Sequence, residues 1–280
     1  MPREFCSLTD AFRTVELSNP AYENGGLRFA TVKSLALGRR ADVSIWVPQA
    51  AQVNTLLILL HGVYGSHWVW PMKGGAHTTA QQMTGRGEIA PMVIVMPSDS
   101  LARDGTGYLT WPSGEDVERW IVEEVPLIAR LAAPQLRPEA SIAIAGLSMG
   151  GYGALRLGAK YADRFRAISA HSAITDVTEM QSFIEEPLAD YIKCAPKLEL
   201  SALHWMRAHR DRLPAIRFDC GLDDDLLVPN RRLHKALRLD GIPHVYEEHS
   251  GGHTWSYWSK HLRGTLLFVD KHCRLDTSTV

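Results

Sequence analysis

The sequence predicts an α/β protein with a mostly parallel central sheet and helices on both of its faces. Short apolar runs alternate along the chain with longer segments in which apolar residues recur at helical spacing. The runs 55–60 and 92–96 are almost entirely apolar, which is typical of strands buried on both faces. Strands that alternate with helices in this way favour a parallel sheet with crossover connections.

The expected elements follow one another in order over most of the chain. The segment 41–47 alternates like an edge strand, and the next strands are expected at 55–60, 92–96, 141–145, 165–169, 215–219 and 244–248. Helices are expected at 76–85, 115–132, 149–161, 230–239 and 254–272. The segment 172–213 fits the alternation poorly and contains Pro187 and Pro196, so we expect a helical insertion over the sheet there.

Length and composition indicate one globular unit. The 280 residues are 45% apolar and 22% charged, values close to those of soluble globular proteins. These values exclude a wholly disordered chain, a fibrous repeat and a polytopic membrane protein. No linker rich in Gly, Ser or Pro divides the chain, so we expect a single domain over 1–280.

The charge balance bears on the kinds of partner. Thirty Lys and Arg residues stand against 31 Asp and Glu residues, a net charge of −1. Nucleic-acid-binding proteins usually carry a basic excess that neutralises phosphates, so no nucleic-acid partner is expected. A net charge near zero gives little repulsion between copies and is compatible with a homo-oligomer.

The cysteines and the start of the chain bear on its location. Cys6, Cys194, Cys220 and Cys273 are far apart and form no CxxC pair, which argues against a zinc ribbon or a thioredoxin-type site and favours free thiols. No signal peptide is visible, and the longest apolar run, 53–60, is far shorter than the ~20 residues needed to span a bilayer. A cytoplasmic protein that does not bind membranes is expected.

The sharpest motif is GxSxG at 146–150, with Ser148 at its centre. An apolar strand precedes it and a helix of small residues follows, as a sharp strand-to-helix turn requires. Glycines are needed two residues before and after the serine because a Cβ there would collide with neighbouring backbone. The hydroxyl of Ser148 would then stand at the carboxyl edge of the sheet as a nucleophile.

A serine hydroxyl is a weak nucleophile without a base. In a common chain order the acid follows the serine and the histidine comes last. His253 follows the last predicted strand and a Ser-Gly-Gly loop, and it precedes the closing helix. We therefore predict His253 as the base, with His249 as an alternative, and interpret His244 as an ordinary residue near the strand.

The acid is expected just after the strand 215–219. Three adjacent carboxylates stand there, and spacing alone does not choose between them. Asp224 comes three residues after Gly221, a GxxD arrangement that turns a carboxylate back towards the histidine. Asp224 is the predicted acid, and Asp223 and Asp225 remain alternatives.

Hydrolysis through a serine also needs two backbone N–H groups aimed at the developing oxyanion. Met149, directly after the nucleophile, would supply one of them. The loop after Leu60 reads His-Gly-Val-Tyr-Gly and would supply the other, from Val63.

Together these residues resemble the α/β-hydrolase superfamily. Within it, the chain is similar to the esterase family that includes esterase D (S-formylglutathione hydrolase), feruloyl and acetylxylan esterases, enterobactin esterases and mycolyltransferases. The matching segments are 59–62, 121–124, 146–154, 220–224 and 251–255. The resemblance implies the α/β-hydrolase fold, a triad of Ser148, Asp224 and His253, and Val63 and Met149 as oxyanion donors.

Aromatic residues crowd the loops that should surround the nucleophile. Aromatic side chains commonly line the pockets that bind an acyl chain or a leaving group. The candidate substrate-binding residues are Tyr64, Trp68, Tyr108, Trp111, Trp255 and His171. No metal-binding motif is present, and a triad needs neither a metal nor a cofactor.

The predicted function is that of a serine esterase that hydrolyses small-molecule carboxylic esters, with short-chain acyl groups expected. An acyltransferase or thioesterase that uses the same triad is the main alternative, because sequence does not say which acceptor replaces the leaving group. A non-catalytic binding module on the same fold is a remote alternative, which an intact Ser, Asp and His set disfavours.

Overall fold

The computed structural model describes residues 11–274 and contains one central sheet of nine strands. The strand order is β1-β2-β3-β5-β4-β6-β7-β8-β9. The strands are β1 (Phe12–Leu17), β2 (Leu27–Ser34), β3 (Arg40–Trp46), β4 (Val53–Leu60), β5 (Val93–Pro97), β6 (Leu136–Leu147), β7 (Ala167–His171), β8 (Ala215–Gly221) and β9 (Val245–His249).

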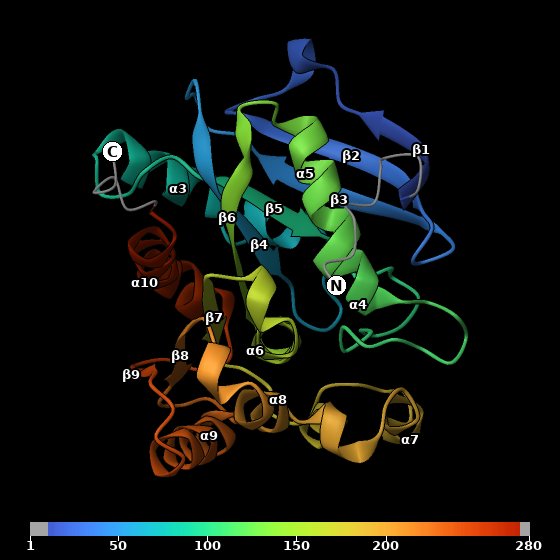
Figure 1. The fold of residues 1–280 in the computed structure, drawn as a ribbon, viewed down its shortest axis with the longest axis vertical. Coiled ribbons are helices and arrows are strands. Elements are labelled where there is room, and N and C mark those ends of the chain that lie inside the picture. Colours follow the sequence, from blue (N-terminus) through green and yellow to red (C-terminus); the bar gives the residue numbers. More distant parts are fainter. Residues whose placement is uncertain (1–10, 275–280) are drawn as a thin grey trace.

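The sheet has an antiparallel end and a parallel remainder (Figure 1). Antiparallel pairs join β1 to β2, β2 to β3 and β3 to β5. In the rest of the sheet, from β5 through β4 and β6 to β9, every neighbouring pair is parallel. The predicted mostly parallel sheet is confirmed. β1 and β2 were not predicted, because their polar residues interrupt the apolar pattern. Such residues are tolerated in β1 because most of this strand is exposed or partly exposed.

Helices cover both faces of the sheet, as predicted. In β4, Leu56 and Ile58 belong to one core cluster, whereas Leu57 and Leu59 belong to the other. The first core includes α5 (Val125–Ala132), α6 (Met149–Lys160) and α9 (Leu227–Leu239). The second includes α2 (Val69–Met72), α3 (Ala76–Gly85) and α10 (Trp255–Cys273). An apolar strand is therefore stabilised by burial on both sides.

The predicted helix 115–132 is divided into three parts. α4 (Val117–Arg119) leads into a π-helical turn, η2 (Trp120–Glu124), and then into α5. Pro126 lies in the first turn of α5 and has no N–H to donate to the turn before it. A locally widened turn accommodates the missing bond. Glu124 uses its buried carboxylate to accept hydrogen bonds from the Ser34 hydroxyl and, at 2.9 Å, from the Ala36 N–H.

The insertion at 172–213 is helical, but its helices are short. They are η4 (Val177–Ser182), α7 (Leu188–Ile192), η5 (Lys197–Leu200), α8 (Ala202–Ala208) and η6 (Arg210–Arg212). Hydrogen bonds attach the insertion to the rest of the protein. The Tyr152 hydroxyl of α6 donates to the Leu200 carbonyl at 2.7 Å, and the Tyr191 hydroxyl donates to the Gly105 carbonyl at 2.6 Å.

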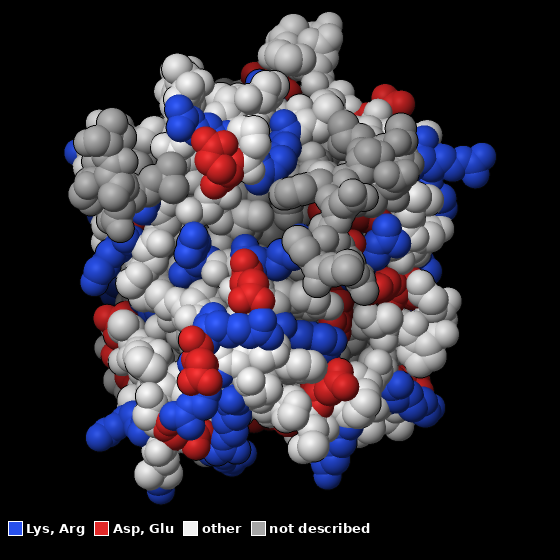
Figure 2. All heavy atoms as spheres, in the orientation of Figure 1, with Lys and Arg blue, Asp and Glu red and all other residues white. Residues whose placement is uncertain are grey.

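Charges of both signs are mixed on the surface seen in Figure 2, where Lys and Arg side chains lie among Asp and Glu side chains. Within residues 11–274, no helix combines the length and apolar character that crossing a bilayer requires. The expected cytoplasmic location and homo-oligomer stay predictions.

Candidate active site

Ser148 occupies a strained turn between β6 and α6. Its φ and ψ are 54° and −121°, values that L-residues rarely adopt. A Cβ at Gly150 would lie 2.5 Å from the His61 carbonyl oxygen, so only glycine fits there. The Ser148 N–H donates to the His171 carbonyl on β7 at 2.9 Å. The turn is thus hydrogen-bonded to β7 and packed closely against the backbone at the end of β4.

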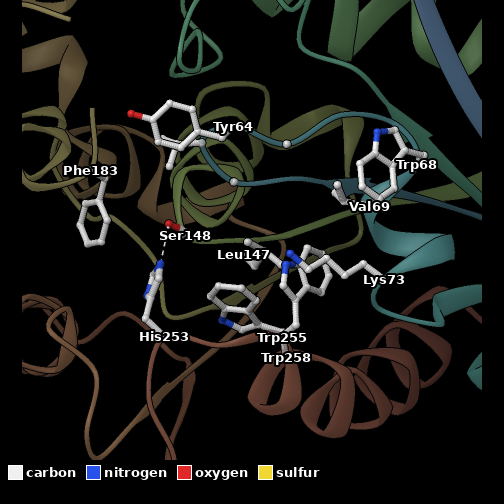
Figure 3. Close-up of a pocket in the computed structure, with 13 residues that line it drawn as sticks. Tyr64, Trp68, Val69, Lys73, Leu147, Ser148, Phe183, His253, Trp255 and Trp258 are labelled. Atoms are coloured by element: carbon white, nitrogen blue, oxygen red, sulfur yellow. Dashed lines mark hydrogen bonds between the residues drawn. The ribbon is translucent and has the colours of Figure 1, made fainter. Parts of the chain in front are cut away.

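A chain of hydrogen bonds links three of the predicted residues. Nε2 of His253 lies 3.0 Å from Oγ of Ser148 (Figure 3). Nδ1 of His253 lies 3.1 Å from both carboxylate oxygens of Asp224. Gly251, with φ 125°, lets the loop after β9 bring His253 over the serine. This arrangement can move a proton from the hydroxyl to an imidazole whose orientation the carboxylate fixes.

The structure separates Asp224 from its acidic neighbours. The Asp224 carboxylate is buried and also accepts a hydrogen bond from the Leu226 N–H at 2.9 Å, whereas Asp223 and Asp225 are exposed. Burial by itself would raise the pKa of Asp224, but the hydrogen bond and charge of His253 outweigh it, so the pKa lies below its ordinary value. Asp224 is therefore ionised at neutral pH.

The alternative base, His249, lies elsewhere. It ends β9 and stacks on His261, with ring centroids 4.2 Å apart. His244, interpreted as an ordinary residue near the strand, has its Nε2 atom 2.8 Å from Nδ1 of His234. Within the described part of the chain, neither histidine makes a hydrogen bond to Ser148.

The loop after β4 packs directly against the nucleophile. A Cβ at Gly62 would lie 3.3 Å from Cβ of Ser148. Two amides of this loop are occupied: the Tyr64 N–H donates to the Asp104 carbonyl at 2.6 Å, and the Gly65 N–H donates to the Gly62 carbonyl at 3.2 Å. The N–H groups of Val63 and of Met149, the first residue of α6, remain as candidates for binding an oxyanion.

A cavity of about 290 Å³ opens over Ser148. Three of the candidate substrate-binding residues, Tyr64, Trp68 and Trp255, line it (Figure 3). Tyr64 and Trp68 are exposed, which leaves their rings free to contact a substrate. Among residues 11–274, no group of three or more acidic, His or Cys residues is arranged to hold a metal ion.

The structure does not bring Tyr108, Trp111 and His171 to this cavity. All three are buried and use their polar atoms inside the protein. The Tyr108 hydroxyl donates to the His61 carbonyl at 2.9 Å, and the Trp111 indole N–H donates to the Thr106 carbonyl at 3.0 Å. Nδ1 of His171 lies 2.8 Å from the Asp219 carboxylate. They support the loops and strands behind the site, and the expectation that they contact substrate is corrected.

Five other side chains line the cavity and were not among the predicted site residues: Val69, Leu147, Phe183, Trp258 and Lys73. Phe183 comes from the insertion, Trp258 from the first turns of α10, and Lys73 follows α2. Trp258 belongs to the aromatic run that follows His253 in the sequence, which was a usable signal. Phe183 and Lys73 lie outside the segments that match the family, so the sequence marked neither of them.

Comparison with known proteins decides the family. The model of the family described as "Putative esterase" matches residues 34–269. The chain belongs to this family. It is accordingly a serine hydrolase that acts on carboxylic esters.

Individual relatives agree with this assignment. The esterase is 29% identical over 231 residues to an acetyl esterase of Caldicellulosiruptor saccharolyticus. The aligned region covers 77% of this chain and 83% of the relative. A solved structure of a ferulic acid esterase superposes with a TM-score of 0.74 at 26% identity, over 92% of this chain and 99% of that one. An S-formylglutathione hydrolase of Staphylococcus aureus also gives 0.74, over 91% and 99% of the two chains, but at 17% identity it shows the fold alone.

Proposed function

We propose that this esterase hydrolyses esters of short-chain acids through Ser148, His253 and Asp224. The observation that carries the proposal is the unbroken chain of hydrogen bonds from the Ser148 hydroxyl through His253 to the buried Asp224 carboxylate, at the floor of a cavity. The modest cavity volume and the similarity to an acetyl esterase support a short acyl group.

In the first half of the reaction, Oγ of Ser148 attacks the ester carbonyl while Nε2 of His253 takes its proton. Asp224 keeps the imidazole oriented and stabilises its charged form. The N–H groups of Val63 and Met149 bind the oxyanion of the tetrahedral intermediate, at the N-terminus of α6 where the helix dipole favours negative charge. The imidazolium then protonates the leaving alcohol, and an acyl-enzyme remains.

In the second half, water replaces the alcohol. His253 takes a proton from the water, which attacks the acyl-enzyme carbonyl through a second tetrahedral intermediate. Ser148 leaves with the proton held by His253, and the carboxylic acid is released. No cofactor is needed in either half.

Hydrolysis of a p-nitrophenyl ester series from acetate to long acyl chains tests the proposal. Wild type should turn over the short esters fastest. Ser148→Ala should lose at least about a thousandfold in kcat, because the nucleophile is gone, while keeping its far-UV spectrum and unfolding midpoint. Ser113→Ala, which changes an exposed serine outside the cavity, should retain full activity. A Ser148→Ala protein with most of the wild-type rate would overturn the assignment, and an optimum at long chains would overturn the short-chain preference.

A further inference from the structure

Lys73 brings a permanent charge to the lining of the cavity. Among the lining residues within 11–274, it is the only Lys, Arg, Asp or Glu. Within the described residues Lys73 forms no ion pair with a carboxylate. An ammonium group that faces a substrate cavity without an acidic partner is available to a negatively charged group of a ligand.

The surroundings of Lys73 form a fixed wall. Its Nζ lies 5.7 Å from the centroid of the Trp255 ring, a cation–π distance. The Trp255 ring makes edge-to-face contacts with Trp70 and Trp258, at centroid distances of 5.5 and 5.4 Å. A Cβ at Gly74 would lie 2.8 Å from Trp255, so the chain beside Lys73 is packed tightly onto this ring.

The opposite end of the cavity has the opposite electrostatic character. Figure 3 shows Tyr64 and Phe183 at one end and Trp68 and Lys73 at the other. Behind Tyr64, the Asp104 carboxylate accepts hydrogen bonds from the Tyr64 hydroxyl at 3.3 Å and from the Glu185 N–H at 2.7 Å. Desolvation and the carboxylates of Asp104 and Glu185 raise the pKa of Tyr64. A negative group on a substrate is therefore disfavoured at the Tyr64 end and favoured at the Lys73 end.

We infer that the esters preferred by this enzyme carry a carboxylate, which pairs with Lys73 at the Trp255 end of the cavity while the ester carbonyl lies over Ser148. This inference rests on the proposed function and adds a substrate class to it. The carboxylate belongs either to the acyl group, as in a dicarboxylic acid half-ester, or to the leaving group. Both present the same chemistry to Lys73, and separate substrates distinguish them.

Matched pairs of substrates that differ by one negative charge provide the test. For the acyl side the pair is mono-p-nitrophenyl glutarate and its methyl ester. For the leaving group the pair is 4-acetoxybenzoate and its methyl ester. In each pair the ratio of kcat/KM for the charged ester to that for the neutral ester is measured at pH 7.5 and low salt, for wild type and Lys73→Gln.

At least one pair should show a wild-type ratio that falls about fivefold in Lys73→Gln, as expected for a partly solvated ion pair. The ratio should also fall with added salt in wild type but not in Lys73→Gln, and Lys73→Arg should restore it in part. Lys235→Gln removes the same charge from an exposed lysine on α9, outside the cavity, and should change neither the ratio nor the rate.

Two failures are distinguishable. Equal ratios in wild type and Lys73→Gln for both pairs, with Ser148-dependent turnover of the neutral esters, would overturn the role of Lys73 alone. Absence of Ser148-dependent turnover of every ester would overturn the proposed function itself. Circular dichroism and unfolding midpoints of the Lys73 variants exclude misfolding as the cause of a changed ratio.

Discussion

The ring of Phe183 lies beside the imidazole of His253, with centroids 5.1 Å apart and planes inclined by 31°. Phe183 belongs to the insertion between β7 and β8, whereas His253 follows β9. The insertion thus contributes a wall of the cavity directly against the residue that we propose as the base. His253 also meets Trp258 edge to face, with ring centroids 4.9 Å apart, so the imidazole contacts two aromatic rings.

Loss of the Phe183 ring should impair catalysis more than stability. An aromatic pair of this kind contributes about 1 kcal/mol, so Phe183→Ala should lower kcat/KM for p-nitrophenyl acetate by about fivefold. The unfolding midpoint should change little, because the ring is partly exposed. Phe268→Ala is the matched control, since Phe268 contacts His272 at 4.5 Å near the end of α10. Equal kinetic effects of the two substitutions would contradict a special role for Phe183.

Asp224 and its neighbour Asp225 should differ sharply in their effect on the rate. Asp224→Asn should lower kcat by about 10³–10⁴-fold, because the amide no longer stabilises the protonated imidazole. Asp225→Asn should stay within about twofold of wild type, since the Asp225 side chain is exposed and outside the hydrogen-bond chain. Steady-state kinetics of both variants, with p-nitrophenyl acetate, decides between the two acids. Comparable losses would reject the assignment of Asp224.

The backbone at the nucleophile turn should tolerate no side chain at Gly150. Its Cβ would lie 2.5 Å from the His61 carbonyl oxygen, and backbone must move to admit it. We expect Gly150→Ala to lower the free energy of unfolding by about 2–3 kcal/mol, measured by urea denaturation. Gly85→Ala at the end of α3 is the control: nothing lies within 4 Å of its Cβ, and alanine there should be neutral or stabilising by up to about 1 kcal/mol. An unchanged midpoint for Gly150→Ala would mean that the turn is less crowded than described.

Mild acid should weaken the fold through His261. Desolvation and, after it, the charge of the neighbouring His249 lower the pKa of His261 to about 4. The unfolded chain, with a histidine pKa of about 6.5, therefore binds the proton first as the pH falls. Stability is lost between these two values, by about 1 kcal/mol once the partial exposure of the ring is taken into account. The Tm of His261→Gln should fall less than that of wild type between pH 7 and pH 4.5, and parallel curves would contradict the effect.

Local patterns were enough to predict much of the architecture. The apolar strands from 55–60 onward were placed to within a few residues, because burial on both faces demands continuous apolar runs. The helices between them were also found near their predicted positions, although the predicted helix 115–132 is interrupted by a π-helical turn. The turn at Ser148 was also predictable, since a strained strand-to-helix turn needs small residues at defined positions. β1 and β2 were missed because exposed strands tolerate the polar residues that hide their pattern.

The sequence by itself determined the parallel sheet, the strained turn at Ser148 and the loop after β9 that carries His253. The signal for each of them is a pattern of residues that are neighbours in the chain. Only the tertiary structure decided which side chains meet in the cavity. Phe183 and Lys73 reach it from segments far from the nucleophile in sequence, whereas Tyr108 and His171 turn into the core. The physical reason is that a side chain's exposure depends on how distant segments pack against it, and no local spacing encodes that packing.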